Sequence, residues 1–192
     1  MILRAIQLLW IGLLLYWLIA ALNFEPAQRT EERRWALLRT ALTIFVFLFM
    51  FSPALRTGWL GRRFVTRSLF VSSIGLVTTA VGVGLAVWAR WVLGRNWSAA
   101  VSLKQSHVLI RSGPYARIRH PIYSGVVLGL VGTALAIGEW RALVAVSFLC
   151  LSWFLKSRKE EAFLASAFGP AFSEHRSQTG MFLPRFRRSA PQ

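Results

Sequence analysis

Residues 68–93, SLFVSSIGLVTTAVGVGLAVWARWVL, form the longest apolar segment of this 192-residue chain. About 20 predominantly apolar residues are enough for a helix to cross the hydrocarbon core of a bilayer. Inside that core every backbone polar group must be hydrogen-bonded within the protein, which a helix achieves by itself. The segment therefore predicts an α-helix that spans a membrane.

Further apolar segments on both sides extend this prediction to the whole chain. Two precede it, at about 5–22 and 36–55, and two shorter ones follow it, at 122–137 and 142–157. Only four residues, 138–141, separate the last two, which predicts an antiparallel hairpin of two short helices. We predict an all-α integral membrane protein with about five transmembrane helices, completed by a cytoplasmic C-terminal helix and tail.

The composition supports a single helical membrane unit. Apolar residues make up 55% of the chain, against about 45–50% in a soluble domain. No polar linker is long enough to separate two domains, so we expect residues 1–192 to form one domain. The apolar run behind Arg4 exceeds the core of a usual signal peptide and is interpreted as the first membrane helix. Cys150 is the single cysteine, which excludes an intrachain disulfide and a cysteine metal cluster.

The charge is strongly basic, with 23 lysines and arginines against 7 acids and a formal net charge of +16. These charges lie between and after the apolar segments, which favours contact with anionic headgroups over nucleic acid, and no nucleic-acid partner is expected. Most of them follow the first, third and last segments, so the positive-inside rule predicts a cytoplasmic location for residues 94–121 and for the tail. Arg56, Arg62, Arg63 and Arg67 oppose this orientation.

Two groups of glycines predict close approach between helices, because an absent side chain lets two backbones come together. No strand precedes Gly82-Val83-Gly84 and no third glycine follows it, so it is not a dinucleotide fingerprint. Both groups are interpreted as packing faces. They are Gly75, Gly82 and Gly84 in the third segment and Gly125, Gly129 and Gly132 in the fourth.

The stretch from His107 to Tyr123, HVLIRSGPYARIRHPIY, concentrates polar and ionisable groups between apolar segments. Such groups are costly next to a bilayer, so their density predicts a functional site. The prolines and glycine within 111–121 predict an ordered, non-helical cradle, with Pro121 in the first turn of the next helix. Arg119 beside the free N–H groups of that helix start predicts a partner that is a carboxylate or a phosphate.

His120 has two interpretations. Alone, it is equally well explained as a headgroup-facing residue, but His107, Tyr115 and Tyr123 nearby favour a role in a site. The histidine spacing matches no common zinc pattern, and we expect no metal.

Glu160 and Glu161 form a second feature, next to Lys156, Arg158 and Lys159. The basic side chains are typical anchors in the headgroup layer, with the acids as their solvated partners. In the alternative interpretation, a carboxylate here binds a positively charged amine or sulfonium. A helix is expected to continue out of the last span as far as Gly169-Pro170. The aromatic and basic residues 182–188 are expected at the membrane surface.

Together, these motifs resemble the isoprenylcysteine carboxyl methyltransferase family, part of a wider group of integral-membrane methyltransferases that includes the phospholipid N-methyltransferases. The resemblance covers residues 90–185 and makes 94–185 the cofactor-binding and catalytic region, behind three N-terminal spans within 1–93. The motifs that carry it, in family order, are GRNWS (94–98), HVLIRSGPY (107–115), RHPIYSG (119–125), Glu160-Glu161 and Phe168-Gly169.

The resemblance implies an S-adenosylmethionine-dependent methyltransferase that holds its cofactor at the cytosolic end of the helices. It implies a lipophilic acceptor, such as an isoprenylcysteine-like carboxylate, that enters from the bilayer. Glu160 most nearly matches the family's carboxylate for the methionine amino group. The cofactor-binding residues implied are His107, Val108, Leu109, Ile110, Tyr115, His120, Pro121, Ile122, Tyr123, Glu160 and Glu161.

Two residues remain open for the arginine that orients the acceptor carboxylate in the family. Arg158 is the nearest arginine, whereas alignment backward from Phe168-Gly169 places Lys156 at that position. The acceptor is also open, with another lipophilic carboxylate, a thiol or an amine as alternatives.

Two other functions compete with methyl transfer. Membrane reductases of the sterol-reductase type share a similar Arg-His-Pro-x-Tyr element and bind NADPH. A non-enzymatic lipid-binding protein would use the basic loops to contact anionic headgroups.

Overall fold

The computed structural model describes residues 1–21, 29–30, 33–94, 102–103 and 109–185. Within these ranges the chain is almost entirely helical, which confirms the predicted helical class. A two-residue strand, β1 (Arg29–Thr30), pairs antiparallel with β2 (Ser102–Leu103). Short 3-10 helices cover Pro53–Leu55, Gly58–Gly61 and Gly113–Ala116. The α-helices are α1 (Ile2–Ala21), α2 (Arg33–Phe51), α3 (Leu69–Leu93), α4 (Pro121–Ile137), α5 (Trp140–Phe168) and α6 (Pro170–Gln178).

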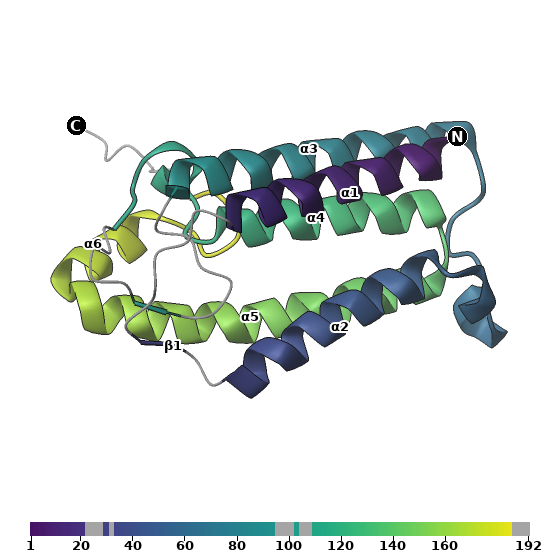
Figure 1. The fold of residues 1–192 in the computed structure, drawn as a ribbon. Coiled ribbons are helices and arrows are strands. Elements are labelled where there is room, and N and C mark those ends of the chain that lie inside the picture. Colours follow the sequence, from purple (N-terminus) through teal and green to yellow (C-terminus); the bar gives the residue numbers. More distant parts are fainter. Residues whose placement is uncertain (22–28, 31–32, 95–101, 104–108, 186–192) are drawn as a thin grey trace.

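The helices form two layers (Figure 1). α1, α3 and α4 run side by side in one layer, and α2 lies along α5 in the other. α4 and α5 belong to different layers and are joined at one end by a tight turn, where Gly138 adopts a left-handed backbone with φ 71°. The predicted antiparallel hairpin is therefore present.

Among the described residues, three helices are long and apolar enough to cross a membrane, namely Ile2–Ala20, Leu69–Leu93 and Trp140–Phe168. Two shorter apolar helices, Leu37–Phe51 and Pro121–Ile137, accompany them. The outer faces of α1, α2, α3 and α5 expose many large apolar side chains, as helix faces turned toward lipid do. Together these features describe a helical membrane protein.

Two predicted boundaries are wrong. The segment predicted at 36–55 ends as a helix at Phe51, because Pro53 starts a separate 3-10 turn. The second arm of the hairpin is not short: α5 has 29 residues and runs beyond the apolar segment to Phe168. The expectation that the last helix continues to Gly169 is confirmed, since Gly169 caps it with φ 48°.

Glycines set the distance between α3 and α4. A Cβ atom added to Gly75 would lie 2.6 Å from the carbonyl oxygen of Gly132, and one added to Gly125 would lie 2.6 Å from the backbone nitrogen of Ala86. Gly82 meets Gly129 in the same way. The packing-face prediction is thus confirmed for these glycines. It is wrong for Gly84, because a Cβ atom added there would meet no described atom within 4 Å outside its own stretch of helix.

Hydrogen bonds between side chains and neighbouring helices join α1, α3 and α4. Thr79 of α3 donates to the carbonyl of Gly129 on α4 at 3.1 Å, and Trp10 of α1 donates its indole N–H to Thr133 of α4 at 3.0 Å. Buried hydroxyls and indoles need such partners where water is absent. These contacts hold α1, α3 and α4 together, and this layer positions the residues at both ends of α4.

At one end of α4 the chain returns to cover the helix start. Gly180 donates to the carbonyl of Arg117 at 3.0 Å and accepts from the backbone N–H of Arg119 at 2.8 Å, while the N–H of His120 donates to Met181 at 3.1 Å. Residues 179–182, which follow α6, therefore lie alongside residues 117–120. The predicted cradle over 111–121 is ordered, but it includes the 3-10 turn Gly113–Ala116.

Candidate functional site

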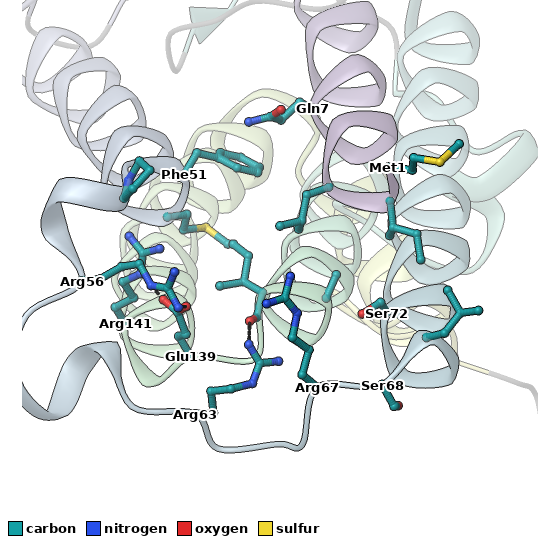
Figure 2. Close-up of a pocket in the computed structure, with 17 residues that line it drawn as sticks. Met1, Gln7, Phe51, Arg56, Arg63, Arg67, Ser68, Ser72, Glu139 and Arg141 are labelled. Atoms are coloured by element: carbon teal, nitrogen blue, oxygen red, sulfur yellow. Dashed lines mark hydrogen bonds and ion pairs between the residues drawn. The ribbon is translucent and has the colours of Figure 1, made fainter.

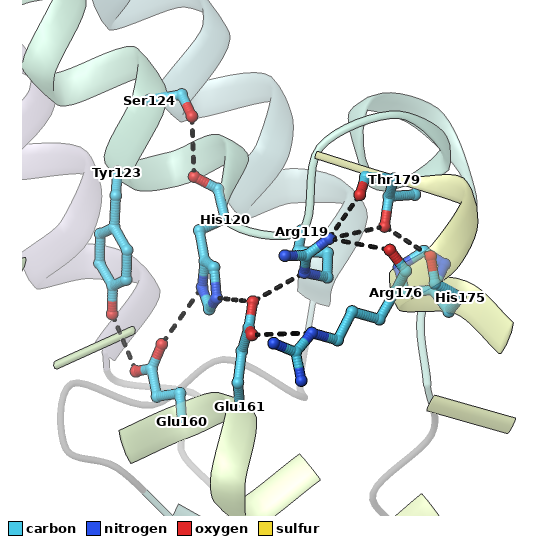
Figure 3. Close-up of polar contacts among 9 residues, drawn as sticks. All are labelled: Arg119, His120, Tyr123, Ser124, Glu160, Glu161, His175, Arg176 and Thr179. Atoms are coloured by element: carbon cyan, nitrogen blue, oxygen red, sulfur yellow. Dashed lines mark hydrogen bonds and ion pairs between the residues drawn. The ribbon is translucent and has the colours of Figure 1, made fainter. Parts of the chain in front are cut away.

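His120, which directly precedes α4, lies between two carboxylates of α5 (Figure 3). Its Nδ1 is 3.5 Å from Oε2 of Glu160, and its Nε2 is 3.4 Å from Oε1 of Glu161. Pro121 occupies the first helical position, as predicted, and leaves His120 as the N-terminal capping residue. The imidazole is therefore held at the junction of the two layers.

Besides His120, two other side chains contact Glu160 in the described structure. The hydroxyl of Tyr123 donates to its Oε1 at 2.8 Å, and the ammonium of Lys156 lies 3.6 Å from the same oxygen. Lys156 precedes Glu160 by one helical turn and also lies 5.2 Å from the centroid of the Tyr123 ring. The Glu160 side chain keeps 21% of its surface exposed, so this carboxylate remains accessible.

Glu161 is held more tightly. Arg119 donates its Nε–H to Oε1 at 2.7 Å, and the Nε of Arg176 lies 3.7 Å from Oε2. Arg119 also donates to the carbonyls of Arg176 and Thr179 at the end of α6. Arg119 thus already has a carboxylate partner within the chain, Glu161, and the pair ties the start of α4 to α5 and α6. The anionic ligand predicted for this helix start stays a prediction.

Aromatic rings line the same place. The ring centroids of His120 and Tyr123 are 5.7 Å apart with an interplanar angle of 12°, and Tyr123 and Trp153 are stacked at 5.9 Å. Phe182 from the returning chain lies 5.8 Å from His120. The cluster thus combines carboxylates, one ammonium and π surfaces in a partly buried site.

The electrostatic balance favours a protonated His120. Burial opposes the charged imidazole, but the neighbouring carboxylates of Glu160 and Glu161 outweigh it, so the pKa of His120 is raised. Its buried Nε2 is close enough to Glu161 for charge attraction, yet in the described structure it has no hydrogen-bond partner of proper geometry. Burial, reinforced by the charge of Glu160, raises the pKa of Tyr115, which stays a neutral phenol.

The residues predicted from the sequence are distributed as follows. His120, Tyr123, Glu160, Glu161 and Lys156 come together in this cluster. The remaining predicted residues are partly buried, buried or outside the described ranges. Leu109 and Ile110 are partly buried, Tyr115, Pro121 and Ile122 are buried, and His107 and Val108 lie outside the described residues.

Arg158 is not brought into the cluster. Its side chain is exposed, as is that of Lys159, which lies 4.9 Å from the ring centroid of Trp35. Side chains two residues apart on a helix point to different faces, whereas those four apart share one. Lys156 and Glu160 therefore share the inner face of α5, and Arg158 lies on another.

Three residues of the cluster were missed from the sequence. Trp153 has the helical spacing of Lys156 and Glu160, and that spacing could have identified it. Arg176 and Phe182 had no such signal. Their positions depend on how the chain reverses after α5 and after α6.

Comparison with known proteins identifies a family. The phospholipid methyltransferase family matches residues 70–171, just over half of the chain. This range includes all of α4 and α5 and the five residues His120, Tyr123, Lys156, Glu160 and Glu161.

Two relatives illustrate the similarity. A cobalt-zinc-cadmium resistance protein, CzcN, of Cupriavidus metallidurans is 38% identical over 119 residues, which cover 60% of this chain and 52% of that protein. A probable protein-S-isoprenylcysteine O-methyltransferase of Oryza sativa is 32% identical over 120 residues, which cover 60% of this chain and 62% of that protein. The chain thus spans about half to three fifths of the length of these relatives.

A solved structure shares the fold. The eukaryotic intramembrane Ras methyltransferase ICMT (isoprenylcysteine carboxyl methyltransferase) matches with a TM-score of 0.53 at 24% identity, covering 82% of this chain and 54% of that one. With its long apolar helices, the protein is an integral, multi-pass membrane protein. Because the family model matches more than half of the sequence, the chain belongs to the phospholipid methyltransferase family of membrane methyltransferases, the group that also includes the isoprenylcysteine carboxyl methyltransferases.

Proposed function

We propose that this protein transfers a methyl group from S-adenosylmethionine to a lipophilic acceptor, such as an isoprenylcysteine-like carboxylate. The observation that carries the proposal is the Glu160 carboxylate. It is partly exposed and surrounded by the Tyr123 hydroxyl, the His120 imidazole and the Lys156 ammonium. A carboxylate at a membrane-helix end with loose, exchangeable partners is suited to binding a cationic ligand.

The residues present fit S-adenosylmethionine, which supplies an electrophilic methyl group on a sulfonium. Glu160 would hold the methionine ammonium. The stacked faces of Tyr123 and Trp153 favour a cation such as the sulfonium through their π electrons, by about 0.5–2 kcal/mol. The buried Nε2 of His120, which lacks a hydrogen-bond partner among the described residues, offers a donor to the ligand.

Lys156 is the better placed of the two residues that can orient an acceptor carboxylate. Its side chain is only 9% exposed and its ammonium is 3.6 Å from Glu160. An acceptor anion on Lys156 would therefore lie beside the carboxylate that holds the methyl donor. Such proximity is the main contribution that a protein can make to an in-line displacement. A lysine binds the anion as a point charge, with less control of geometry than an arginine.

Glu161 has a different role in this proposal. Both of its oxygens have guanidinium partners, Arg119 and Arg176. We assign it to positioning: it fixes Arg119 at the start of α4 and holds α6 against the site. The two adjacent carboxylates thus divide the work, with Glu160 for binding and Glu161 for structure.

The orientation and the number of crossings belong to the same proposal. The cluster lies at the helix ends that adjoin residues 94–121 and the tail, which the positive-inside rule puts in the cytoplasm. A water-soluble cofactor would then enter from the cytosol and the acceptor from the bilayer. The shorter helices α2 and α4 would complete five crossings.

The decisive experiment is titration calorimetry of the detergent-purified protein with S-adenosylmethionine and, separately, with NADPH. Saturable binding of S-adenosylmethionine alone supports the proposal and justifies a labelled-methyl assay with hydrophobic carboxylates, thiols and amines. Binding of NADPH alone would replace it with the reductase, and binding of neither would favour the lipid-binding alternative.

A further inference from the structure

A pocket of about 620 Å³ lies at the opposite end of α4 from the His120–Glu161 cluster (Figure 2). α4 has 17 residues, so the two places are roughly 25 Å apart along the helix. The start of α1, the end of α2, the first turn of α3 and the α4–α5 turn surround the pocket. It is therefore separate from the proposed methyltransferase site.

Arginines dominate the polar lining. Arg56, Arg63, Arg67 and Arg141 line the pocket together with one acid, Glu139. The excess of positive charge favours an anionic ligand. Arg56, Arg63 and Arg67 are three of the four arginines that oppose the predicted membrane orientation. The positive-inside rule therefore does not explain why they lie here.

Three of the arginines are already bonded to the protein. Arg56 and Arg141 lie 2.5 Å and 2.7 Å from the two oxygens of Glu139. Arg141 also donates to the carbonyls of Phe49 and Ser52, and Arg63 donates to the carbonyl of Ile137 at 2.9 Å. These contacts hold the three arginines in the lining of the pocket, and they give both carboxylate oxygens of Glu139 a guanidinium partner.

Arg67 differs from the others. Its side chain is exposed, and among the described residues it has neither a hydrogen bond nor an ion pair. Figure 2 shows its guanidinium extending into the pocket. Ser68, the N-terminal capping residue of α3, and Ser72 of its first turn line the pocket next to it. The Ser68 hydroxyl accepts from the N–H of Val71 at 3.1 Å. The positive end of the helix dipole still attracts an anion, as the guanidinium of Arg67 does.

The rest of the lining is apolar. Ile2 and Leu3 come from α1, Met50 and Phe51 from α2, and Leu69 from α3. A small inorganic anion would leave this surface without a partner. A ligand with an anionic head and an apolar tail would cover both parts, and a membrane supplies such molecules at the helix ends.

We propose that this pocket binds an anionic phospholipid. Its phosphate lies on Arg67 and the first turn of α3, and an acyl chain lies against the apolar residues of α1 and α2. The site is independent of methyl transfer, because none of its residues belongs to the His120–Glu161 cluster.

Arg67→Gln tests the proposal, with Arg62→Gln as its matched control. Arg62 lies in the same loop and is also exposed, but it does not line the pocket. Both changes remove one positive charge from the same end of the molecule. Binding of phosphatidylglycerol and of phosphatidylcholine is measured by native mass spectrometry of the detergent-purified chain, with inorganic phosphate as competitor.

The expected result is preferential binding of phosphatidylglycerol that Arg67→Gln weakens about tenfold and that Arg62→Gln leaves within about twofold. Ser72→Leu narrows the pocket without changing its charge and should also weaken phosphatidylglycerol binding. It tests the proposal if Arg67→Gln does not fold. If both arginine variants lose phosphatidylglycerol binding equally, the lipid is held by general attraction to the basic surface and not by this pocket. Displacement of the lipid by millimolar phosphate would reveal a site for a free anion, and equal binding of the two lipids would also overturn the proposal.

Discussion

The two ends of α4 each carry a carboxylate in contact with cationic groups, but the contacts differ in kind. Glu139, at the α4–α5 turn, has a guanidinium within 2.7 Å of each oxygen, and its side chain is 4% exposed. Glu160, at the other end, has a phenol at 2.8 Å and two cations at 3.5 Å or more, and is 21% exposed. The first carboxylate is fully satisfied by the protein, whereas the second keeps room for another partner.

This difference separates a structural ion pair from a binding group. A buried carboxylate with short, complete guanidinium contacts cannot exchange a partner without exposing an unpaired charge. A carboxylate with longer contacts loses less when a ligand ammonium replaces one of them. The following variants test whether the two ends respond as this comparison requires.

Glu139→Gln is expected to have the largest effect on stability. It leaves the buried guanidinium of Arg141 without its counter-charge, and breaking a buried pair costs about 3–5 kcal/mol. The melting temperature in detergent should fall by roughly 10 °C. Glu174→Gln, which breaks the exposed pair with Arg111, is the control and should change it little. A similar melting temperature for both variants would mean that the buried ion pair of Glu139 stabilises the fold no more than an exposed one.

Glu160→Gln should give the reverse pattern. The amide still accepts the hydrogen bond from Tyr123, so the melting temperature should change far less than in Glu139→Gln. The affinity for S-adenosylmethionine should fall about tenfold or more, because the charged contact with the ammonium is lost. Calorimetry measures this affinity, and an unchanged value would eliminate Glu160 as the cofactor carboxylate.

Lys156→Gln and Arg158→Gln form a pair with equal loss of charge on the same helix. Lys156 is buried beside Glu160, whereas Arg158 is exposed. With a carboxylate acceptor, Lys156→Gln should raise the acceptor KM about tenfold, and Arg158→Gln should change it within about twofold. The affinity for S-adenosylmethionine should not fall in either variant, since Lys156 competes for Glu160 rather than supporting the cofactor. Loss confined to Arg158→Gln would return the acceptor role to that arginine.

Local pattern alone was sufficient for much of the fold. The apolar run 68–93 became α3 almost unchanged, because lipid exposure leaves helix as the only way to satisfy its backbone. Spacing also located the face of α3 that carries Gly75 and Gly82. It could not show that Gly84 points away from α4, since that depends on the crossing of the two helices.

The candidate site was predictable only in part. His120, Tyr123, Glu160 and Lys156 were named from motifs, and they do lie together. A helix was expected to run through both Lys156 and Glu160, so their spacing of four could have favoured Lys156 over Arg158 from the sequence alone.

The remaining contacts of the site come from tertiary structure. Arg176 and Phe182 reach it because the chain returns along residues 117–120, and no local signal marks such a return. Phe182 of the tail lies against His120. The predicted position of residues 182–188 at the membrane surface stays a prediction, and residues 186–188 lie outside the described ranges.

The smallest expected effect concerns pH, and it tests whether His120 is charged between its two carboxylates. Its folded pKa is raised above the ordinary value of about 6.5. The stabilisation from the imidazolium is therefore complete below that value and is lost as the pH rises through the folded pKa.

The melting temperature of the native protein, compared with that of His120→Asn, should thus show an advantage near pH 6 that shrinks at higher pH. His175 acts in the opposite sense, because burial and the charges of Arg111 and Arg119 lower its pKa. Its contribution is present in both proteins and cancels in the difference. A difference that grows with pH would mean that His120 is neutral, and Glu160 would then face Lys156 as its only cation within the described cluster.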